Sequence, residues 1–197
     1  MSKKKIALLI NTLILILELI AIGGSLLKDH FIALEYYTND SNIIALFSSL
    51  LFIIFYKKDL KIVKDLRLLA TSLLTETFIV VITILVPMYN FNYKLLMFTD
   101  NFLILHTICP ILCIISYVFF EKTSDKIYLC PILTIVYSII LVLMNIFKLV
   151  DGPYPFLKVN TQSIIVSLLW GILIIGGSYF ISSLLNYINK KIQGAKN

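Results

Sequence analysis

Six long apolar segments take up most of this 197-residue chain, and they constrain its fold more than any other feature. A helix that crosses the hydrocarbon core of a membrane needs about 20 mostly apolar residues. The segments that meet this requirement are 6–27, 36–56, 68–89, 101–120, 127–147 and 161–188. Too little sequence remains for a soluble domain. We therefore predict an all-α polytopic membrane protein in which six transmembrane helices form one bundle, a single domain over residues 1–197.

Composition supports a membrane location and argues against binding to nucleic acid. Hydrophobic residues make up 59% of the chain, whereas soluble domains contain roughly 45–50%. The net charge is +6, but the basic residues flank the apolar segments and leave no folded basic module. We expect these side chains to contact anionic lipid headgroups at the membrane surface, and we predict no nucleic-acid partner.

The distribution of basic residues predicts the orientation. If the N-terminus is cytoplasmic, thirteen Lys and Arg residues lie on the cytoplasmic side and four lie outside. Cytoplasmic loops normally carry this excess, so both termini are predicted to be cytoplasmic. The first apolar run is longer than that of a typical signal peptide, which favours a retained helix. Abundant Ile, Lys and Asn suggest an AT-rich genome, and we expect the plasma membrane of a bacterium.

A histidine and a threonine are predicted at similar depth near the outer surface. His106 is the only histidine inside any predicted span, and it lies about 8 Å below the outer end of the fourth span. An imidazole is costly to place in a membrane, which makes it a candidate functional residue. Thr38 begins the second span, with Asn39, Ser41 and Asn42 beside it.

A hydroxyl and an imidazole at one depth can form a nucleophile and its base. The imidazole takes the hydroxyl proton as the oxygen attacks a carbonyl, and later returns it to the leaving group. Ester bonds of lipids lie at this level of the membrane. We therefore predict Thr38 and His106 as catalytic residues that need no cofactor. The structural alternative is that His106 only bonds a neighbouring helix and Thr38 only caps the second span.

Two carboxylates are also predicted inside spans, Glu18 in the first and Glu76 in the third. Each must be protonated, paired or exposed to a polar cavity. Either could orient His106, with Glu18 the better placed of the two. They could instead carry protons in a transporter or bond across helices.

The fourth span also places His106, Cys109 and Cys113 along one helical face. Imidazole and sulfur are suitable ligands for zinc or copper. However, no fourth ligand is evident, and cysteines in membrane helices usually pack as small apolar residues. We predict no metal site.

Two further expectations concern the shape of the helices. Pro110 and Pro131 lie within the fourth and fifth predicted spans and should kink or open them. The polar segment 57–67 is expected to be an interfacial connection between the second and third spans.

Three short motifs resemble those of the Pr6Pr family of membrane proteins. Residues 37–42 (YTNDSN) are similar to the Thr- and Ser-Asn-containing opening of its second span. Residues 106–110 (HTICP) resemble its H-x-x-x-P motif in the fourth span. Residues 154–159 (YPFLKV) resemble its Y-P-F-L-D-V turn, with Lys158 in place of the Asp.

That family is in turn similar to the androgen-induced (AIG/ADTRP) membrane proteins. Those are threonine hydrolases that cleave fatty acid esters of hydroxy fatty acids with a Thr in the second span and a His in the fourth. The resemblance thus implies a lipid-like ester substrate, Thr38 as nucleophile and His106 as base. Apart from this resemblance, we expect the substrate head or the oxyanion to be bound by Asn39, Ser41, Asn42 and Tyr154.

Two other functions are compatible with the sequence. The chain could be a non-enzymatic membrane protein, either an accessory subunit or a carrier that uses Glu18, Glu76 and His106. It could also be an acyltransferase, because the same Thr and His chemistry operates when an alcohol replaces water.

Overall fold

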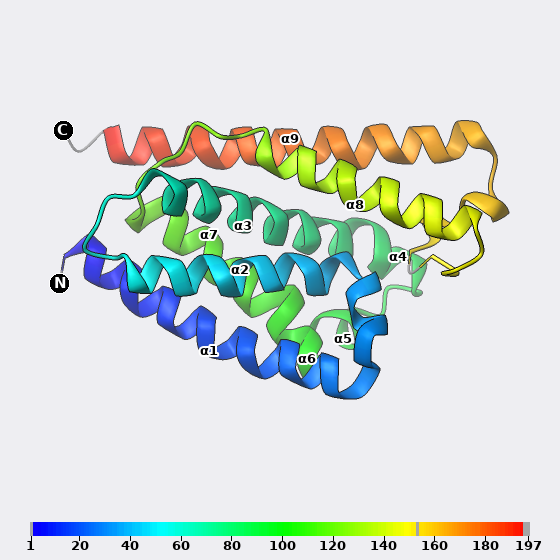
Figure 1. The fold of residues 1–197 in the computed structure, drawn as a ribbon, viewed down its shortest axis with the longest axis horizontal. Helices are drawn as coiled ribbons and strands as arrows, with labels where there is room; N and C mark the ends of the chain where they lie inside the picture. Colours follow the sequence, from blue (N-terminus) through cyan, green and yellow to red (C-terminus); the bar gives the residue numbers. More distant parts are fainter. Residues whose placement is uncertain (1, 153, 195–197) are drawn as a thin grey trace.

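Six helices long and apolar enough to span a membrane run along the molecule, and both termini lie at one end (Figure 1). The computed structural model describes residues 2–152 and 154–194, and within them every regular element is helical. The spans are Lys3–Asp29, Tyr37–Ile54, Lys61–Met88, Asp100–Phe120, Leu129–Ile146 and Ile164–Gly194. The predicted all-α bundle of six transmembrane helices is confirmed.

Two of the spans are divided by π-helical segments. The first, second, fifth and sixth spans are α1, α2, α8 and α9. The third consists of α3 (Lys61–Val80), η2 (Val81–Leu85) and α4 (Val86–Met88). The fourth consists of α6 (Asp100–Phe102), η3 (Leu103–Ile108) and α7 (Cys109–Phe120). Short helices at the end opposite the termini are η1 (His30–Glu35), α5 (Tyr93–Met97), η4 (Pro155–Leu157) and η5 (Val159–Thr161).

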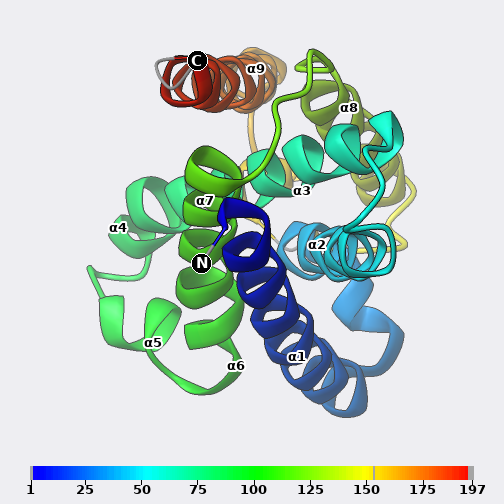
Figure 2. The same ribbon diagram turned by 90° about the vertical axis from the view of Figure 1, so that its left-hand side faces the viewer.

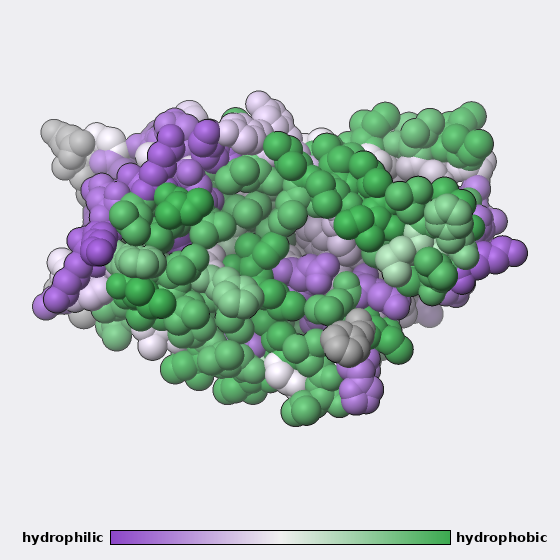
Figure 3. Space-filling view, viewed as in Figure 1, coloured by the Kyte–Doolittle hydropathy of each residue, from purple (hydrophilic) through white to green (hydrophobic). Residues whose placement is uncertain are grey.

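The spans pack in three layers, which are visible in the view along the bundle (Figure 2). α3 and α7 form the middle layer, with α1 and α2 on one side and α8 and α9 on the other. α3 contacts α2, α7, α8 and α9 and is the most buried span. By contrast, α9 is the least buried and exposes Ile164, Ile165, Leu168, Leu169, Ile172 and Leu173. Figure 3 shows the resulting apolar surface between more hydrophilic ends, as expected where side chains face lipid.

The third span begins earlier than the sequence indicated. The segment 57–67 was expected to be a surface connection, but α3 already begins at Lys61. The prediction is wrong because the charge of Arg67 is compensated inside the bundle. Its Nε and Nη2 donate to the two oxygens of Glu121 at 2.9 and 3.1 Å, and Nη1 donates to Ser48 and Ser49. A paired and fully hydrogen-bonded guanidinium can occupy a buried helical position.

Prolines explain both π-helical segments. Pro110 has no N–H to donate to the carbonyl of His106, four residues earlier, and η3 ends directly before Cys109. Pro87 has the same relation to Thr83 within η2. Loss of one such bond favours local rearrangement of the helix. Pro131 behaves otherwise and the predicted kink is wrong, because it is the third residue of α8, where an N–H has no intrahelical partner.

The buried ion pair gives a test of the bundle. Glu121→Gln leaves the Arg67 charge buried without a counterion, so we expect it to lower the free energy of unfolding by about 3–5 kcal/mol. Asp125→Asn breaks the exposed pair with Lys190, and it should leave the free energy of unfolding nearly unchanged because solvent screens this pair. Reversible denaturation in mixed detergent micelles measures both. Equal effects of the two substitutions would contradict the assigned role of the buried pair.

Candidate functional site

A threonine and a histidine from different spans meet at the end of the bundle opposite the termini. Thr38 lies in the first turn of α2 and His106 lies in η3, and Thr38 Oγ1 is 3.2 Å from His106 Nε2. Both residues are buried, with exposed fractions of 7% and 4%. The structure therefore brings together the two residues predicted to form a nucleophile and its base.

The second ring nitrogen determines the direction of this hydrogen bond. His106 Nδ1 lies 2.6 Å from the backbone carbonyl oxygen of Leu96, in α5. A carbonyl can only accept, so Nδ1 must carry the proton. In a neutral imidazole Nε2 is then an unprotonated acceptor, and the hydroxyl of Thr38 donates to it. This is the tautomer that a general base requires.

Neighbouring contacts fix the imidazole in this position. Thr107 Oγ1 donates to the carbonyl of Met97 at 2.9 Å, so consecutive residues of η3 hold α5 in place. The ring of Phe102 stacks on the imidazole with centroids 4.9 Å apart. The ring is thus held by a backbone carbonyl and an aromatic face.

A tyrosine provides a donor beside the threonine. Tyr154 precedes η4, and its hydroxyl is 3.5 Å from Thr38 Oγ1 and accepts from the backbone N–H of Thr38 at 3.4 Å. That N–H belongs to the first turn of α2 and has no intrahelical carbonyl partner. Burial raises the pKa of Tyr154 to about 12, so its hydroxyl stays protonated at neutral pH. Two N–H or O–H groups therefore lie beside the nucleophile, at the positive end of a helix.

The polar residues that follow Thr38 support the backbone. Ser41 Oγ and Asn42 Nδ2 donate to the carbonyl of Thr38 at 2.9 and 2.6 Å. Asn39 Nδ2 donates to the carbonyl of Ala33 at 2.8 Å. None of the three lines the cavity described below. All three were expected to bind substrate, but Ser41 and Asn42 bond the Thr38 carbonyl and Asn39 bonds η1.

The two carboxylates do not orient His106, and that prediction is wrong. Leu96 and Thr38 occupy the two ring nitrogens. Glu18 is fully buried, and neither of its oxygens has a hydrogen-bond partner among the described residues. Glu76 Oε2 instead accepts from Tyr37 at 2.6 Å and from Thr134 at 3.1 Å.

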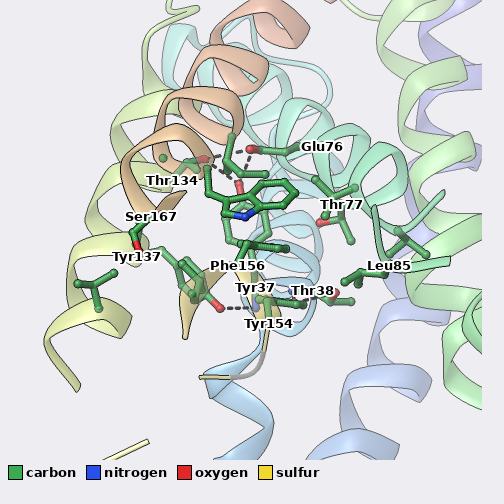
Figure 4. Close-up of a pocket in the computed structure, with 18 of the residues that line it drawn as sticks. Tyr37, Thr38, Glu76, Thr77, Leu85, Thr134, Tyr137, Tyr154, Phe156 and Ser167 are labelled. Carbon is green, nitrogen blue, oxygen red and sulfur yellow. Dashed lines mark hydrogen bonds between the residues drawn. The ribbon is translucent and has the colours of Figure 1, made fainter. Parts of the chain in front are cut away.

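An apolar cavity of about 110 Å³ extends from Thr38 into the bundle. Figure 4 shows Thr38 and Tyr154 at one end of it and Glu76 and Thr134 at the other. Its wall between these ends is formed mainly by apolar side chains, among them Val80, Val81, Leu85, Val142, Phe156, Leu157, Trp170 and Ile174. This wall is not predictable from the sequence, because apolar residues inside spans carry no signal that separates a cavity from a packed core.

The imidazole and thiols that share one face of the fourth span have other contacts. Cys113 Sγ lies 4.0 Å from Arg67 Nη2, and Cys109 lies next to Glu18. Within residues 2–152 and 154–194, no three His, Cys, Asp or Glu side chains are arranged to hold a metal ion.

Comparison with protein-family models, curated proteins and solved structures gives no match to this chain. The chemistry of the site is therefore inferred from its own geometry.

The tautomer of His106 can be measured directly. We expect ¹⁵N spectra of histidine-labelled protein in micelles at neutral pH to show a protonated Nδ1 and an unprotonated Nε2 for His106. The exposed His30 is the only other histidine in the chain, so His30→Gln assigns the signals. A proton on Nε2 would mean that His106 cannot accept from Thr38.

Proposed function

We propose that this protein is an intramembrane hydrolase of fatty acyl or similar lipid-like esters, with Thr38 as nucleophile and His106 as general base. The observation that carries the proposal is the hydrogen bond from Thr38 Oγ1 to an imidazole whose other nitrogen is fixed on the Leu96 carbonyl. A nucleophile, a base and a group that orients the base are the three parts that activation of a hydroxyl requires. The motifs that resemble the Pr6Pr family, through that family's similarity to threonine hydrolases, point to the same two residues.

The first half of the reaction transfers the acyl group to the enzyme. Thr38 Oγ1 attacks the ester carbonyl while its proton moves to His106 Nε2. The hydroxyl of Tyr154 and the N–H of Thr38 are the nearest donors for the oxyanion. Collapse of the intermediate breaks the ester bond, and the alcohol leaves with the proton from His106.

The second half releases the acid and restores the enzyme. Water gives a proton to His106 Nε2 as its oxygen attacks the acyl-Thr38 carbonyl. The bond to Thr38 Oγ1 then breaks, and the hydroxyl regains its proton from His106. The products are a carboxylic acid and an alcohol, and no cofactor takes part. If an alcohol enters in place of water, the same steps give acyl transfer.

The surroundings of the site suit a lipid-like ester. The cavity beside Thr38 is lined mainly by apolar side chains, which accommodate an acyl chain. Thr38 also lies at an end of the bundle, in the first turn of a span, where the ester groups of membrane lipids would be in reach. We place this end outside the cell because the basic residues favour cytoplasmic termini. The abundance of Ile, Lys and Asn favours a bacterial plasma membrane.

A fluorophosphonate probe tests the nucleophile. We expect purified wild type to be labelled at Thr38, Thr38→Ala to lose labelling completely, and His106→Ala to be labelled roughly 10²–10⁴-fold more slowly. Thr75→Ala is the matched control, since Thr75 is also a buried helical threonine but donates only to the Thr71 carbonyl.

Labelling that is unchanged in Thr38→Ala, or absent from wild type that is monodisperse and helical, would reject this function. In that case a carrier or accessory role would be favoured. The rates of p-nitrophenyl ester hydrolysis should rank the variants in the same order as the labelling rates. Addition of an alcohol distinguishes acyl transfer from hydrolysis, because acyl transfer forms a new ester.

The phenol of Tyr154 gives a second test. Tyr154→Phe removes one oxyanion donor and preserves the ring, so kcat for ester hydrolysis should fall roughly 10²-fold while KM changes little. Tyr117→Phe removes another buried tyrosine hydroxyl, which accepts from the Ser124 N–H away from the cavity, and it serves as the comparison. A normal kcat in Tyr154→Phe would exclude the phenol from oxyanion stabilisation.

A further inference from the structure

The end of the cavity away from Thr38 is closed by a second polar group. Glu76 Oε2 accepts from the hydroxyls of Tyr37 and Thr134, and these two hydroxyls lie 2.8 Å from each other. The Cys130 thiol lies 3.7 Å from the same oxygen. One carboxylate oxygen is thus saturated by groups from α2 and α8.

The other oxygen of Glu76 has no hydrogen-bond partner among the described residues. The residue is 2% exposed and lines the cavity whose other end is Thr38. A buried polar atom without a partner is unfavourable, and more so between membrane helices, where water is scarce. A carboxyl group at this position is explained if a bound molecule provides the missing partner.

We propose that Glu76 Oε1 binds a free hydroxyl on the acyl chain that is transferred to Thr38, so that the enzyme prefers substrates whose acyl group carries such a hydroxyl. This inference rests on the proposed hydrolase function and specifies its substrate class. A hydroxyl can donate to an ionised carboxylate and can accept from a protonated one. It therefore satisfies Glu76 in either state. An ammonium group carries a greater desolvation penalty in an apolar cavity, and a carboxylate would repel an ionised Glu76.

The packing of α2 against α3 gives the approximate position of this hydroxyl. Ser41 Oγ and Thr77 Oγ1 are 3.1 Å apart, so these two residues lie at the same depth. Thr38 precedes Ser41 by three residues in α2 and therefore lies nearer the end of the bundle opposite the termini. Glu76 precedes Thr77 by one residue in α3, which runs in the opposite direction, and it therefore lies one residue deeper. At 1.5 Å per residue, Glu76 lies about 6 Å deeper than Thr38. The hydroxyl is therefore separated from the ester carbonyl by several carbon atoms.

Three matched esters test the inference on purified protein in micelles. They are p-nitrophenyl hexanoate, 6-hydroxyhexanoate and 6-aminohexanoate, and each is assayed with wild type, Glu76→Gln and Glu76→Leu. We expect wild type to have a kcat/KM roughly five- to tenfold higher for the hydroxy ester than for the hexanoate, as for one added hydrogen bond. Glu76→Gln should keep part of this ratio, because its amide can donate and accept. Glu76→Leu should reduce the ratio to one or below.

The outcomes separate this inference from the function on which it rests. Hydrolysis by wild type with equal kcat/KM for hexanoate and hydroxy ester would overturn the inference and leave the hydrolase function intact. A preference for the amino ester would replace the hydroxyl by a cationic group and also overturn it. A hydroxyl preference that persists in Glu76→Leu would assign the recognition to another residue. Failure of folded wild type to hydrolyse any of the three esters would reject both proposals.

Discussion

The hydrogen bond between His106 Nδ1 and the carbonyl of Leu96 determines what the site can do. It fixes the tautomer, leaves Nε2 free to accept, and aims that nitrogen at Thr38. Catalytic histidines are more often oriented by a carboxylate, which also stabilises the imidazolium that forms. A neutral carbonyl avoids placing another charge among membrane helices, where an ionised side chain is costly. For the proposed hydrolase the consequence is a weaker stabilisation of the imidazolium, which would suit reactive esters better than amides.

The irregular segments of the bundle are what bring the site together. Pro110 leaves the carbonyl of His106 without its usual donor, and η3 forms where the α-helical pattern is interrupted. The wider turn carries His106 and Thr107 to the carbonyls of α5. On the facing helix, the first turn of α2 presents Thr38, whose N–H donates to the Tyr154 hydroxyl and not to a helical carbonyl. Each half of the site thus uses a backbone group at a helix end, where no intrahelical partner exists.

The sequence predicted the number and type of the helices because each span is long and apolar. It did not predict that α3 begins as early as Lys61, because the partner of the buried Arg67 is Glu121, 54 residues along the chain. It also paired Thr38 with His106, since an imidazole and a hydroxyl at one depth are unusual in a membrane. The group that orients His106 could not be predicted from the sequence, because it is the backbone carbonyl of Leu96 and every residue has such a carbonyl. The positions of Ser41 and Asn42, three and four residues after Thr38, already favoured bonds to the preceding turn.

The central claim is that Thr38 carries the acyl group between the two halves of the reaction. The most direct test is rapid acid quenching of protein mixed with excess p-nitrophenyl hexanoate, followed by intact and peptide mass spectrometry. The account predicts a single hexanoyl group per chain, located on the peptide that contains Thr38 and absent from Thr38→Ala. Turnover of the ester with no acylated intermediate, or with the acyl group on another residue, would contradict it.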